Sequence, residues 1–179
     1  NMLKDIGCDY VIIGHSERRK NHLEDDDTIN NKIKNAHKAG LKVILCVGEN
    51  LNDRENGTYL QTVAHQLING LADIPNIDNI IIAYEPVWAI GTSKVASEQQ
   101  IEEMHEFLTK TIKDLHLTSQ VFDQIPKIIY GGSVNQENAA KILALNYVSG
   151  LLVGGASLNI EKFCKIILER NTIKGKSCN

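Results

Sequence analysis

Two side chains suited to acid–base chemistry stand where apolar runs of the chain end. Glu85 follows the β-branched run at 80–82, with Pro86 directly after it, and His15 follows the run at 10–13. A β-branched run is typical of a buried parallel strand, and proline stops a strand while holding the residue before it extended. A carboxylate and an imidazole at two strand ends favour a catalytic site. The alternatives are a solvated glutamate and a core histidine bonded to backbone.

The residues after Glu85 form an apolar loop, Val87 to Ile90, followed by Gly91. Exposed loops are normally polar, so this segment is predicted to be a lid that closes over the acid and excludes water. Gly91 is its expected flexible point. The alternative is a buried turn beside a strand end.

Two glycine pairs follow the last two strand-like runs, at Gly131-Gly132-Ser133 and at Gly154-Gly155. Glycine lets backbone N–H groups approach an anion closely, so the pairs favour a phosphate site over two tight turns without a ligand. With the base and the imidazole, they indicate proton abstraction next to a carbonyl in a small phosphorylated substrate. Glu17 and Arg18 are expected to form an ion pair that supports the loop.

The elements that must position these residues alternate regularly between strand and helix. Strand-like runs lie at 10–13, 42–47, 79–83, 127–130 and 150–153. Apolar residues at helical spacing lie between and after them: Ile29, Ile33 and Ala36; Val63, Leu67 and Leu71; Ile101, Met104, Leu108, Ile112 and Leu115; Ala139, Ile142 and Leu143; Ile160, Phe163 and Ile167. The third helical stretch opens with a capping-box pattern at Ser97. The rhythm predicts an α/β fold of parallel strands with helical crossovers.

A doubly wound sheet and a (β/α)₈ barrel both fit that rhythm, and the strand ends distinguish them. Every run finishes in glycine or a polar residue, which is the pattern of a barrel with one shared site at the C-terminal ends of its strands. A doubly wound nucleotide binder would concentrate its glycines in a single GxGxxG turn, and the sequence contains none.

Composition narrows the possible partners. The chain has 179 residues, 42% apolar and 23% charged, which suits one soluble domain or part of a larger one. A net charge of −3 without a basic stripe argues against a nucleic-acid or anionic-membrane partner. The four cysteines, including Cys164 and Cys178, lack metal-binding spacing, and Cys8 and Cys46, which lie beside or within apolar runs, are read as buried reduced thiols of a cytosolic protein. No run approaches the roughly 20 apolar residues of a membrane span, and no signal peptide opens the chain.

Several motifs closely resemble the triosephosphate isomerase family. They are Tyr10-Val-Ile-Ile-Gly-His-Ser-Glu-Arg-Arg19, Cys46-Val-Gly-Glu49, Ala83-Tyr-Glu-Pro-Val-Trp-Ala-Ile-Gly-Thr92, Tyr130-Gly-Gly-Ser-Val134 and Val153-Gly-Gly-Ala-Ser-Leu158. The resemblance implies a (β/α)₈ barrel that interconverts dihydroxyacetone phosphate and D-glyceraldehyde 3-phosphate in glycolysis and gluconeogenesis. It also implies a cytoplasmic homodimer with no metal and no organic cofactor.

The resemblance assigns roles to individual residues. Glu85 would be the base and His15 the neutral electrophile that polarises the carbonyl. Gly91, Ser133, Gly154 and Gly155 would bind the phosphate through backbone N–H groups. Tyr130 would latch the closed lid, Glu17 would orient the site, and Arg18 would anchor the loop near the dimer interface.

Two departures from the family pattern qualify the resemblance. The lid reads Gly91-Thr92-Ser93-Lys94 where the family has Gly-Thr-Gly-Lys, and serine tolerates positive φ less well than glycine. The first three βα units are missing, and 1–7 is read as the tail of a helix. Residues 1–179 are therefore expected to form one partial barrel domain with strands four to eight, inactive alone. The alternatives are a catalytically dead interaction module and another phosphosugar barrel enzyme such as an epimerase, which the His15 and Glu85 motifs disfavour.

Overall fold

A computed structural model of the chain describes residues 2–91, 94–119 and 124–172; residues 1, 92–93, 120–123 and 173–179 lie outside the described part. The side chains of 116–119 and 170–172 are likewise outside it. The elements in chain order are α1 (Met2–Asp5), β1 (Tyr10–Ile13), α2 (Ser16–His22), α3 (Asp26–Lys38), β2 (Lys42–Val47), α4 (Leu51–Glu55), α5 (Tyr59–Gly70), β3 (Ile80–Tyr84), η1 (Val87–Ala89), α6 (Glu98–Ser119), β4 (Ile128–Tyr130), α7 (Ala139–Ala144), β5 (Gly150–Leu151), η2 (Gly155–Leu158) and α8 (Ile160–Thr172).

The five strands form one parallel sheet in the order of the sequence, β1-β2-β3-β4-β5. Each strand therefore pairs with its successor after a helical crossover, as the alternating pattern predicts. Strands β1 and β2 match their predicted bounds, whereas β5 is shorter than the predicted 150–153. Its neighbour β4 has only three residues, and within the described residues β5 has no second partner.

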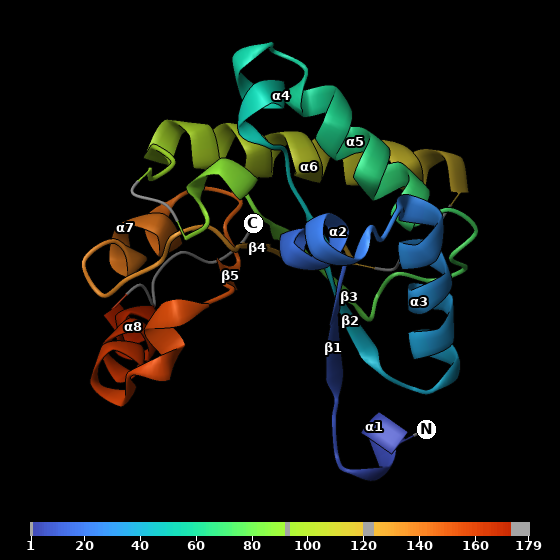
Figure 1. Cartoon of the computed structure of the whole chain (residues 1–179), viewed down its shortest axis with the longest axis horizontal. Helices are drawn as coiled ribbons and strands as arrows, with labels where there is room; N and C mark the ends of the chain where they lie inside the picture. The colour runs from blue at the N-terminus through green and yellow to red at the C-terminus, as the bar shows by residue number, and fades with distance from the viewer. Residues whose placement is uncertain (1, 92–93, 120–123, 173–179) are drawn as a thin grey trace.

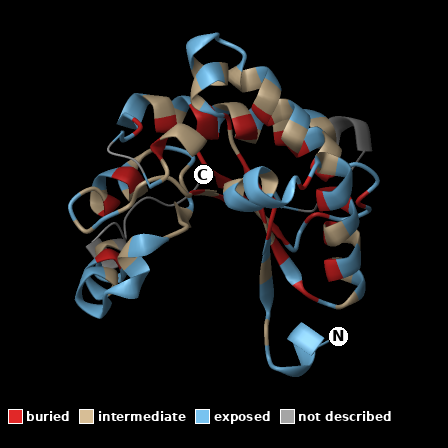
Figure 2. Ribbon diagram, in the orientation of Figure 1, coloured by how far each residue is buried: buried red, intermediate tan, exposed pale blue. Residues whose placement is uncertain are grey.

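One face of the sheet carries the core. Side chains from alternate positions, such as Val43 and Leu45 of β2 and Ile80 and Ile82 of β3, are buried against helices. Contacts of the strands with α3, α5 and α6 supply this cover, and Figure 1 shows α5 and α6 lying across one side of the strands. Figure 2 shows the buried residues concentrated on the strands and on the inner sides of these helices.

The opposite face of the sheet is more open. Ile12 of β1 is 46% exposed, and Ile44, Ile81 and Ile129 are only partly buried. Successive strand residues point to opposite faces, so these side chains share the face that the helices do not cover. Within the described residues, β1 pairs only with β2 and β5 only with β4, so the strands form an open sheet.

The helices confirm most of the predicted apolar stripes. Ile29, Ile33 and Ala36 of α3 are buried, as are Val63 and Leu67 of α5. The predicted capping box opens α6, because the Gln100 N–H donates to Ser97 Oγ and the Ser97 N–H donates to Gln100 Oε1. The helix predicted to begin near 135 starts at Ala139 instead. The residues before it form turns in which the Asn135 side chain accepts the Glu137 and Asn138 N–H groups.

The stripe predicted for α8 is mostly exposed. Ile160 is 78% exposed and Ile167 52% exposed, whereas Ile166 is the buried residue. Helix α8 packs against α7 and η2, and the side that bears Ile160 and Ile167 is left largely exposed. Figure 2 shows α1 and α8 as largely exposed ends of the chain.

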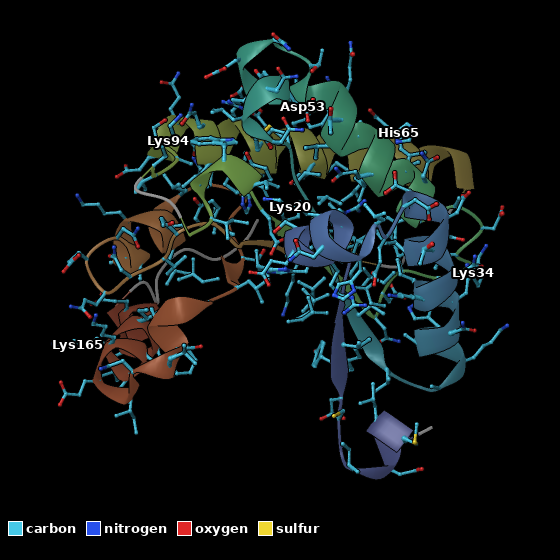
Figure 3. All side chains as sticks on the ribbon, viewed as in Figure 1. Lys20, Lys34, Asp53, His65, Lys94 and Lys165 are labelled. Carbon is cyan, nitrogen blue, oxygen red and sulfur yellow. The ribbon has the colours of Figure 1, made fainter. Side chains whose placement is uncertain are left out.

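Two short helices escaped the sequence pattern. Helix α2, with the sequence SERRKNH, and α4, with LNDRE, bury no residues. They lack the apolar periodicity from which a helix is predicted. Charged side chains occupy these helices instead, among them Lys20 of α2 and Asp53 of α4, which Figure 3 labels.

The cysteines of the described part differ in their burial. Cys46 is buried, Cys8 is only partly buried and Cys164 is exposed, and all three are unpaired. The prediction for Cys178 lies outside the described residues. None of the helices in the described part is long and apolar enough to cross a membrane.

Candidate active site

The C-terminal ends of the five parallel strands meet along one edge of the sheet. Apart from Tyr130, which is the last residue of β4, each predicted site residue comes from a segment that follows one of these ends. In strand order the segments begin with Gly14 after β1, Gly48 after β2, Glu85 after β3, Gly131 after β4 and Leu152 after β5.

The structure brings the two predicted catalytic residues together. His15 Nε2 lies 3.1 Å from Glu85 Oε1. The other carboxylate oxygen, Glu85 Oε2, accepts a hydrogen bond from the Ser16 N–H at 3.1 Å. The Glu85 side chain is buried, with only 2% of the residue exposed. Each of its carboxylate oxygens therefore contacts a protein group, one the His15 ring and the other the Ser16 N–H.

The start of α2 sets the protonation pattern of the imidazole. His15 is the N-cap of α2, and its Nδ1 accepts the Glu17 N–H at 3.3 Å. A ring nitrogen that accepts a hydrogen bond carries no proton, so the single proton of the neutral ring is on Nε2. The nitrogen beside Glu85 is therefore the one that can donate.

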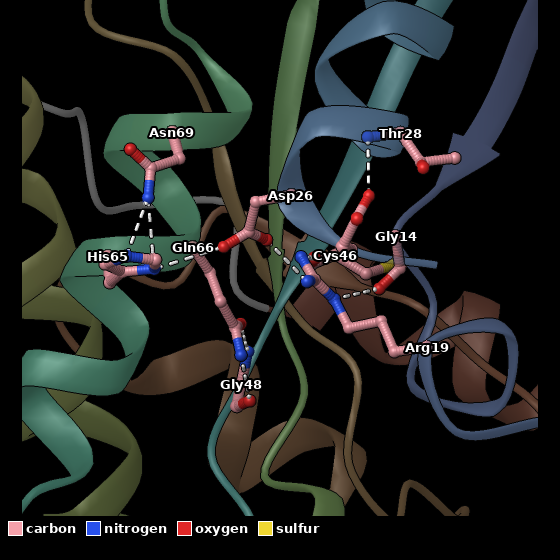
Figure 4. Close-up of polar contacts among 10 residues, drawn as sticks. Gly14, Arg19, Asp26, Thr28, Cys46, Gly48, His65, Gln66 and Asn69 are labelled. Atoms are coloured by element: carbon pink, nitrogen blue, oxygen red, sulfur yellow. Dashed lines mark hydrogen bonds and ion pairs between the residues drawn. The ribbon is translucent and has the colours of Figure 1, made fainter. Parts of the chain in front are cut away.

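Arg19 fastens the loop that carries His15. Its Nε donates to the Gly14 carbonyl at 2.9 Å, and its Nη1 contacts Asp26 Oδ1 at 2.6 Å. The same guanidinium reaches the Cys46 carbonyl at 3.5 Å. Figure 4 shows Arg19 extended between Gly14 and Asp26. This side chain ties the ends of β1 and β2 to each other and to α3.

Burial shifts the acidity of the carboxylate and of the thiol next to it. Removal from water raises the pKa of Glu85, although His15 and the Ser16 N–H oppose the shift. The Cys46 side chain next to it also lowers the pKa of Glu85. Burial, and then the charge of Glu85, raise the pKa of Cys46, so it remains a thiol. A carboxylate with a raised pKa is a stronger base, which suits proton abstraction near neutral pH.

Small residues allow the backbone to pack against Glu85. A Cβ on Gly48 would lie 1.7 Å from the Glu85 carbonyl oxygen, far inside any real contact. A Cβ on Gly131 would lie 3.1 Å from Glu85 Cγ. Glycine is therefore a packing requirement at Gly48, and at Gly131 an added Cβ would press on the side chain of the base.

A second buried carboxylate lies behind the first. Glu49 is fully buried, and its Oε1 accepts hydrogen bonds from Trp88 Nε1 at 2.8 Å and from the Tyr84 hydroxyl at 3.1 Å. Its carbonyl accepts the Val87 N–H at 3.0 Å. Burial raises the pKa of Glu49, and the hydrogen bonds from Trp88 and Tyr84 oppose the shift. Glu49 therefore holds the predicted lid at its first turn.

The predicted lid begins as a short 3₁₀ helix, η1, in which Ala89 is fully buried. The Ser133 hydroxyl donates to the Ala89 carbonyl at 2.5 Å, which joins η1 to the loop after β4. Gly91 has a φ of +63°, which favours glycine. The predictions for Thr92 and Ser93 lie outside the described residues.

Tyr130 ends β4 with its ring buried. Its hydroxyl has no hydrogen-bond partner within the described part of the chain, and burial raises its pKa. The Gly132 backbone lies close to it, since a Cβ there would be 2.2 Å from the hydroxyl oxygen. The contact of the Tyr130 hydroxyl with the closed lid stays a prediction.

The predicted ion pair between Glu17 and Arg18 is wrong. Arg18 instead contacts Glu24, with its Nη2 2.5 Å and its Nε 2.6 Å from Oε1. Neighbouring residues on a helix point in different directions, and Glu24, which is buried, is the carboxylate in reach. Lys32 also contacts Glu24. Hydrogen bonds from Arg18 and then from Lys32 lower the pKa of Glu24.

Gly154 and Gly155 stand at the start of η2, after β5. A Cβ at either position would meet no atom within 4 Å, so protein packing does not explain the glycines, and the space beside them is open. As to metals, none of the described His, Cys, Asp and Glu side chains form a group of three that could hold an ion.

Sequence reasoning missed several neighbours of Glu85 and of the lid. Cys46 was read only as a buried thiol, and Glu49 only as a polar strand end. The available signal was the Gly48-Glu49 pair directly after a buried strand, since a small residue there permits close approach. The Ser16 N–H contact carries no sequence signal, because a backbone group makes it.

Comparison with known proteins identifies the family. A family model described as triosephosphate isomerase matches residues 1–170. Curated triosephosphate isomerases from Thermodesulfovibrio yellowstonii and Lawsonia intracellularis are 49% and 51% identical over 166 and 168 residues, 93% of this chain in each case. The chain spans about 66% of their length.

A solved structure agrees. The crystal structure of triosephosphate isomerase from Bartonella henselae superposes with a TM-score of 0.85 at 37% identity, covering 95% of this chain and 68% of that one. This likeness confirms the predicted fold class, with five βα units of the barrel present in the chain. The match over nearly the whole chain in sequence and in structure shows that the chain belongs to the triosephosphate isomerase family.

Proposed function

We propose that the protein containing this chain interconverts dihydroxyacetone phosphate and D-glyceraldehyde 3-phosphate. The observation that carries the proposal is the buried carboxylate of Glu85, 3.1 Å from the Nε2 of His15. The raised pKa of Glu85 suits a base, and Nε2 bears the proton because Nδ1 accepts the Glu17 N–H. A base and a neutral donor thus meet at one strand edge.

The reaction moves one proton between adjacent carbons. Glu85 takes a proton from the carbon that bears the hydroxyl group, and the electrons of that C–H bond pass toward the carbonyl oxygen. His15 Nε2–H donates to that oxygen and stabilises the enediolate. His15 gives its Nε2 proton to the former carbonyl oxygen and takes the proton of the original hydroxyl oxygen, while Glu85 returns its own proton to the neighbouring carbon, so that carbonyl and hydroxyl exchange places. Both carboxylate oxygens are occupied at present, so the side chain must leave Ser16 and His15 before it can reach the substrate.

The phosphate of the substrate binds to backbone N–H groups of Gly91, Ser133, Gly154 and Gly155. The open space beside Gly154 and Gly155 supports this assignment, because an anion can approach the backbone there. The hydroxyl of Ser133 donates to the Ala89 carbonyl of η1, and this contact between the proposed phosphate loop and the proposed lid supports the assignment. A phosphate held here would connect ligand binding to lid closure.

The remaining assignments support the same reaction. Tyr130 latches the closed lid, and its hydroxyl has a free bonding capacity within the described residues. Glu17 orients the site through the N–H that His15 accepts. Arg18 anchors the loop near a dimer interface, and its side chain is 49% exposed although it pairs with Glu24.

The complete protein is proposed to be a cytoplasmic homodimer that needs neither a metal nor an organic cofactor and binds no nucleic acid. Residues 1–179 form a single partial barrel domain of it. Its substrate class is the phosphorylated triose.

A non-catalytic interaction module is the second candidate. The open edges of β1 and β5 favour it, because within the described residues each of these strands has one partner. An unpaired strand edge invites another chain. A module of this kind needs no base at Glu85, which separates the two candidates.

The test is turnover by the full-length protein with Glu85→Gln as the variant. Glutamine keeps the shape of the side chain and cannot accept the carbon-bound proton, so kcat should fall by about 10²–10⁴-fold. In deuterated water the unmodified protein should incorporate deuterium at the carbon beside the carbonyl. A variant with near-normal kcat would remove Glu85 from the role of base, and an inactive unmodified protein would favour the interaction module.

A further inference from the structure

The end of β2 leaves backbone groups that need new partners. The pairing of β2 with β3 ends at Val47 and Tyr84, and Gly48 is the next residue. The side-chain amide of Gln66, from α5, satisfies both polar groups of Gly48. Gln66 Oε1 accepts the Gly48 N–H at 2.8 Å, and Gln66 Nε2 donates to the Gly48 carbonyl at 3.1 Å. Figure 4 shows these two contacts side by side.

The choice of glutamine follows from these two contacts. An amide carries one acceptor and one donor group at fixed spacing, as a peptide unit does, so it continues the ladder where the strand stops. Gln66 occurs on the face of α5 whose neighbours Val63, Leu67 and Gly70 are buried. A polar side chain among buried apolar positions indicates a specific partner.

Gly48, which these two hydrogen bonds hold, packs directly against the backbone of Glu85. A Cβ on Gly48 would lie 1.7 Å from the carbonyl oxygen and 2.6 Å from the carbonyl carbon of Glu85. The Glu85 N–H also donates to the Val47 carbonyl at 2.8 Å. Any displacement of Gly48 is therefore passed to the backbone of Glu85.

Gly48 is also next in the chain to Glu49, the residue that contacts the lid. Glu49 follows Gly48, its carbonyl accepts the Val87 N–H, and its carboxylate accepts Trp88 Nε1. The two hydrogen bonds between Gln66 and Gly48, called the clamp from here on, therefore lie beside the base Glu85. They also lie next to Glu49, which holds η1.

We propose that Gln66 is a positioning residue that fixes Gly48, and through it both the base Glu85 and the first turn of the lid. The part of this proposal that concerns catalysis rests on the proposed isomerase function. Gln66 touches neither the reacting carboxylate nor the proposed phosphate donors, so its effect passes through Gly48.

The experiment compares Gln66→Met and Gln66→Glu with the control Gln61→Met in the full-length protein. Methionine fills similar space without hydrogen bonds. Glutamate is closer in shape but places a second acceptor against the Gly48 carbonyl. Gln61 is exposed on the same helix, so its substitution should leave kcat and the Trp88 signal unchanged.

Both Gln66 variants should lower kcat by about 10–100-fold, the scale expected for a reacting group displaced by about 1 Å. KM should change by less than about twofold, because no substrate contact is removed. Trp88 is the only tryptophan of residues 1–179, and its emission should shift as Glu49 moves. Hydrogen exchange at the amides of Glu85 and Val87 should quicken. If hydrogen bonding matters more than shape, the glutamate variant should lose at least as much as the methionine variant.

Wild-type kcat and unchanged Trp88 emission in Gln66→Met would overturn the proposal. If the unmodified protein shows no isomerase activity, the proposed function fails, while emission and exchange still test the clamp. If neither variant folds, hydrogen exchange at the Gly48 amide of the unmodified protein tests the clamp. A Gly48 amide as slow to exchange as that of Glu85 supports the clamp, and exchange as fast as in exposed loops refutes it.

Discussion

Replacing Gly48 by alanine should displace the base without altering any group that reacts. The added Cβ would lie 1.7 Å from the Glu85 carbonyl oxygen and 3.2 Å from the Glu85 Cα. The obstructing atoms belong to backbone, so no side chain can rotate away. The two strand ends must therefore separate.

The size of the displacement follows from the geometry. Real Cβ atoms essentially never approach another heavy atom within 3.0 Å, so the backbones must part by about 1.3 Å. That movement stretches the bond between the Glu85 N–H and the Val47 carbonyl, now 2.8 Å. Overpacking of this kind costs about 1–3 kcal/mol of stability, or about 2–12 °C in Tm for a domain of this size. A misplacement of about 1 Å lowers the rate by about 10²-fold.

Thermal unfolding and steady-state turnover of the full-length protein measure these effects. Gly70→Ala is the matched control. Its Cβ would meet Leu45 at 3.4 Å, an ordinary contact, and alanine favours a helix by up to about 1 kcal/mol over glycine. Gly48→Ala should therefore lose both stability and kcat while Gly70→Ala keeps both. An unchanged Tm together with an unchanged kcat in Gly48→Ala would refute the reasoning.

Three further predictions concern the lid, the second carboxylate and the isolated chain. A phosphorylated transition-state mimic should change Trp88 fluorescence in the full-length protein, and an unchanged spectrum with ligand bound would argue against a lid. Burial raises the pKa of Glu49 above its usual 4.5, so the folded state binds this proton at higher pH than the unfolded chain does, and stability falls as pH rises through the folded pKa. The stability of Glu49→Gln relative to wild type, from denaturant unfolding, should therefore grow between about pH 4 and about pH 8; a constant difference would contradict this. The 179-residue chain alone should show background isomerase rate and elute as oligomers, because β1 and β5 have open edges in the described part, and an active monomer would contradict that expectation.

Strand positions were predictable because burial dictates residue type. The β-branched run before Glu85 and the apolar run after Lys42 admit few other structures. Once the strands are parallel, their C-terminal ends share an edge, so the meeting of His15 with Glu85 follows from topology. Their contact at 3.1 Å agrees with that inference.

Contacts that depend on tertiary geometry were not predictable in the same way. Helix α2 has no apolar stripe, so its start at His15, which selects the imidazole tautomer, is invisible to periodicity. Glu24 was not recognised as the partner of Arg18, because their contact depends on the turn between α2 and α3. That Cys46 lies beside Glu85 follows only from the pairing of β2 with β3, which the sequence does not state.

Glycines along the sheet edge explain how one carboxylate can be held so closely. A Cβ on Gly14 would lie 2.9 Å from the Cys46 carbonyl, one on Gly48 would strike the Glu85 backbone, and one on Gly131 would crowd Glu85 Cγ. These residues follow β1, β2 and β4; β2 and β4 flank β3, the strand that leads into Glu85. Backbones that approach this closely bring N–H and carbonyl groups to fixed distances without flexible side chains. The position of Glu85 therefore depends on small residues as much as on charged ones, and a search of the sequence for titratable groups alone would find the base but not what positions it.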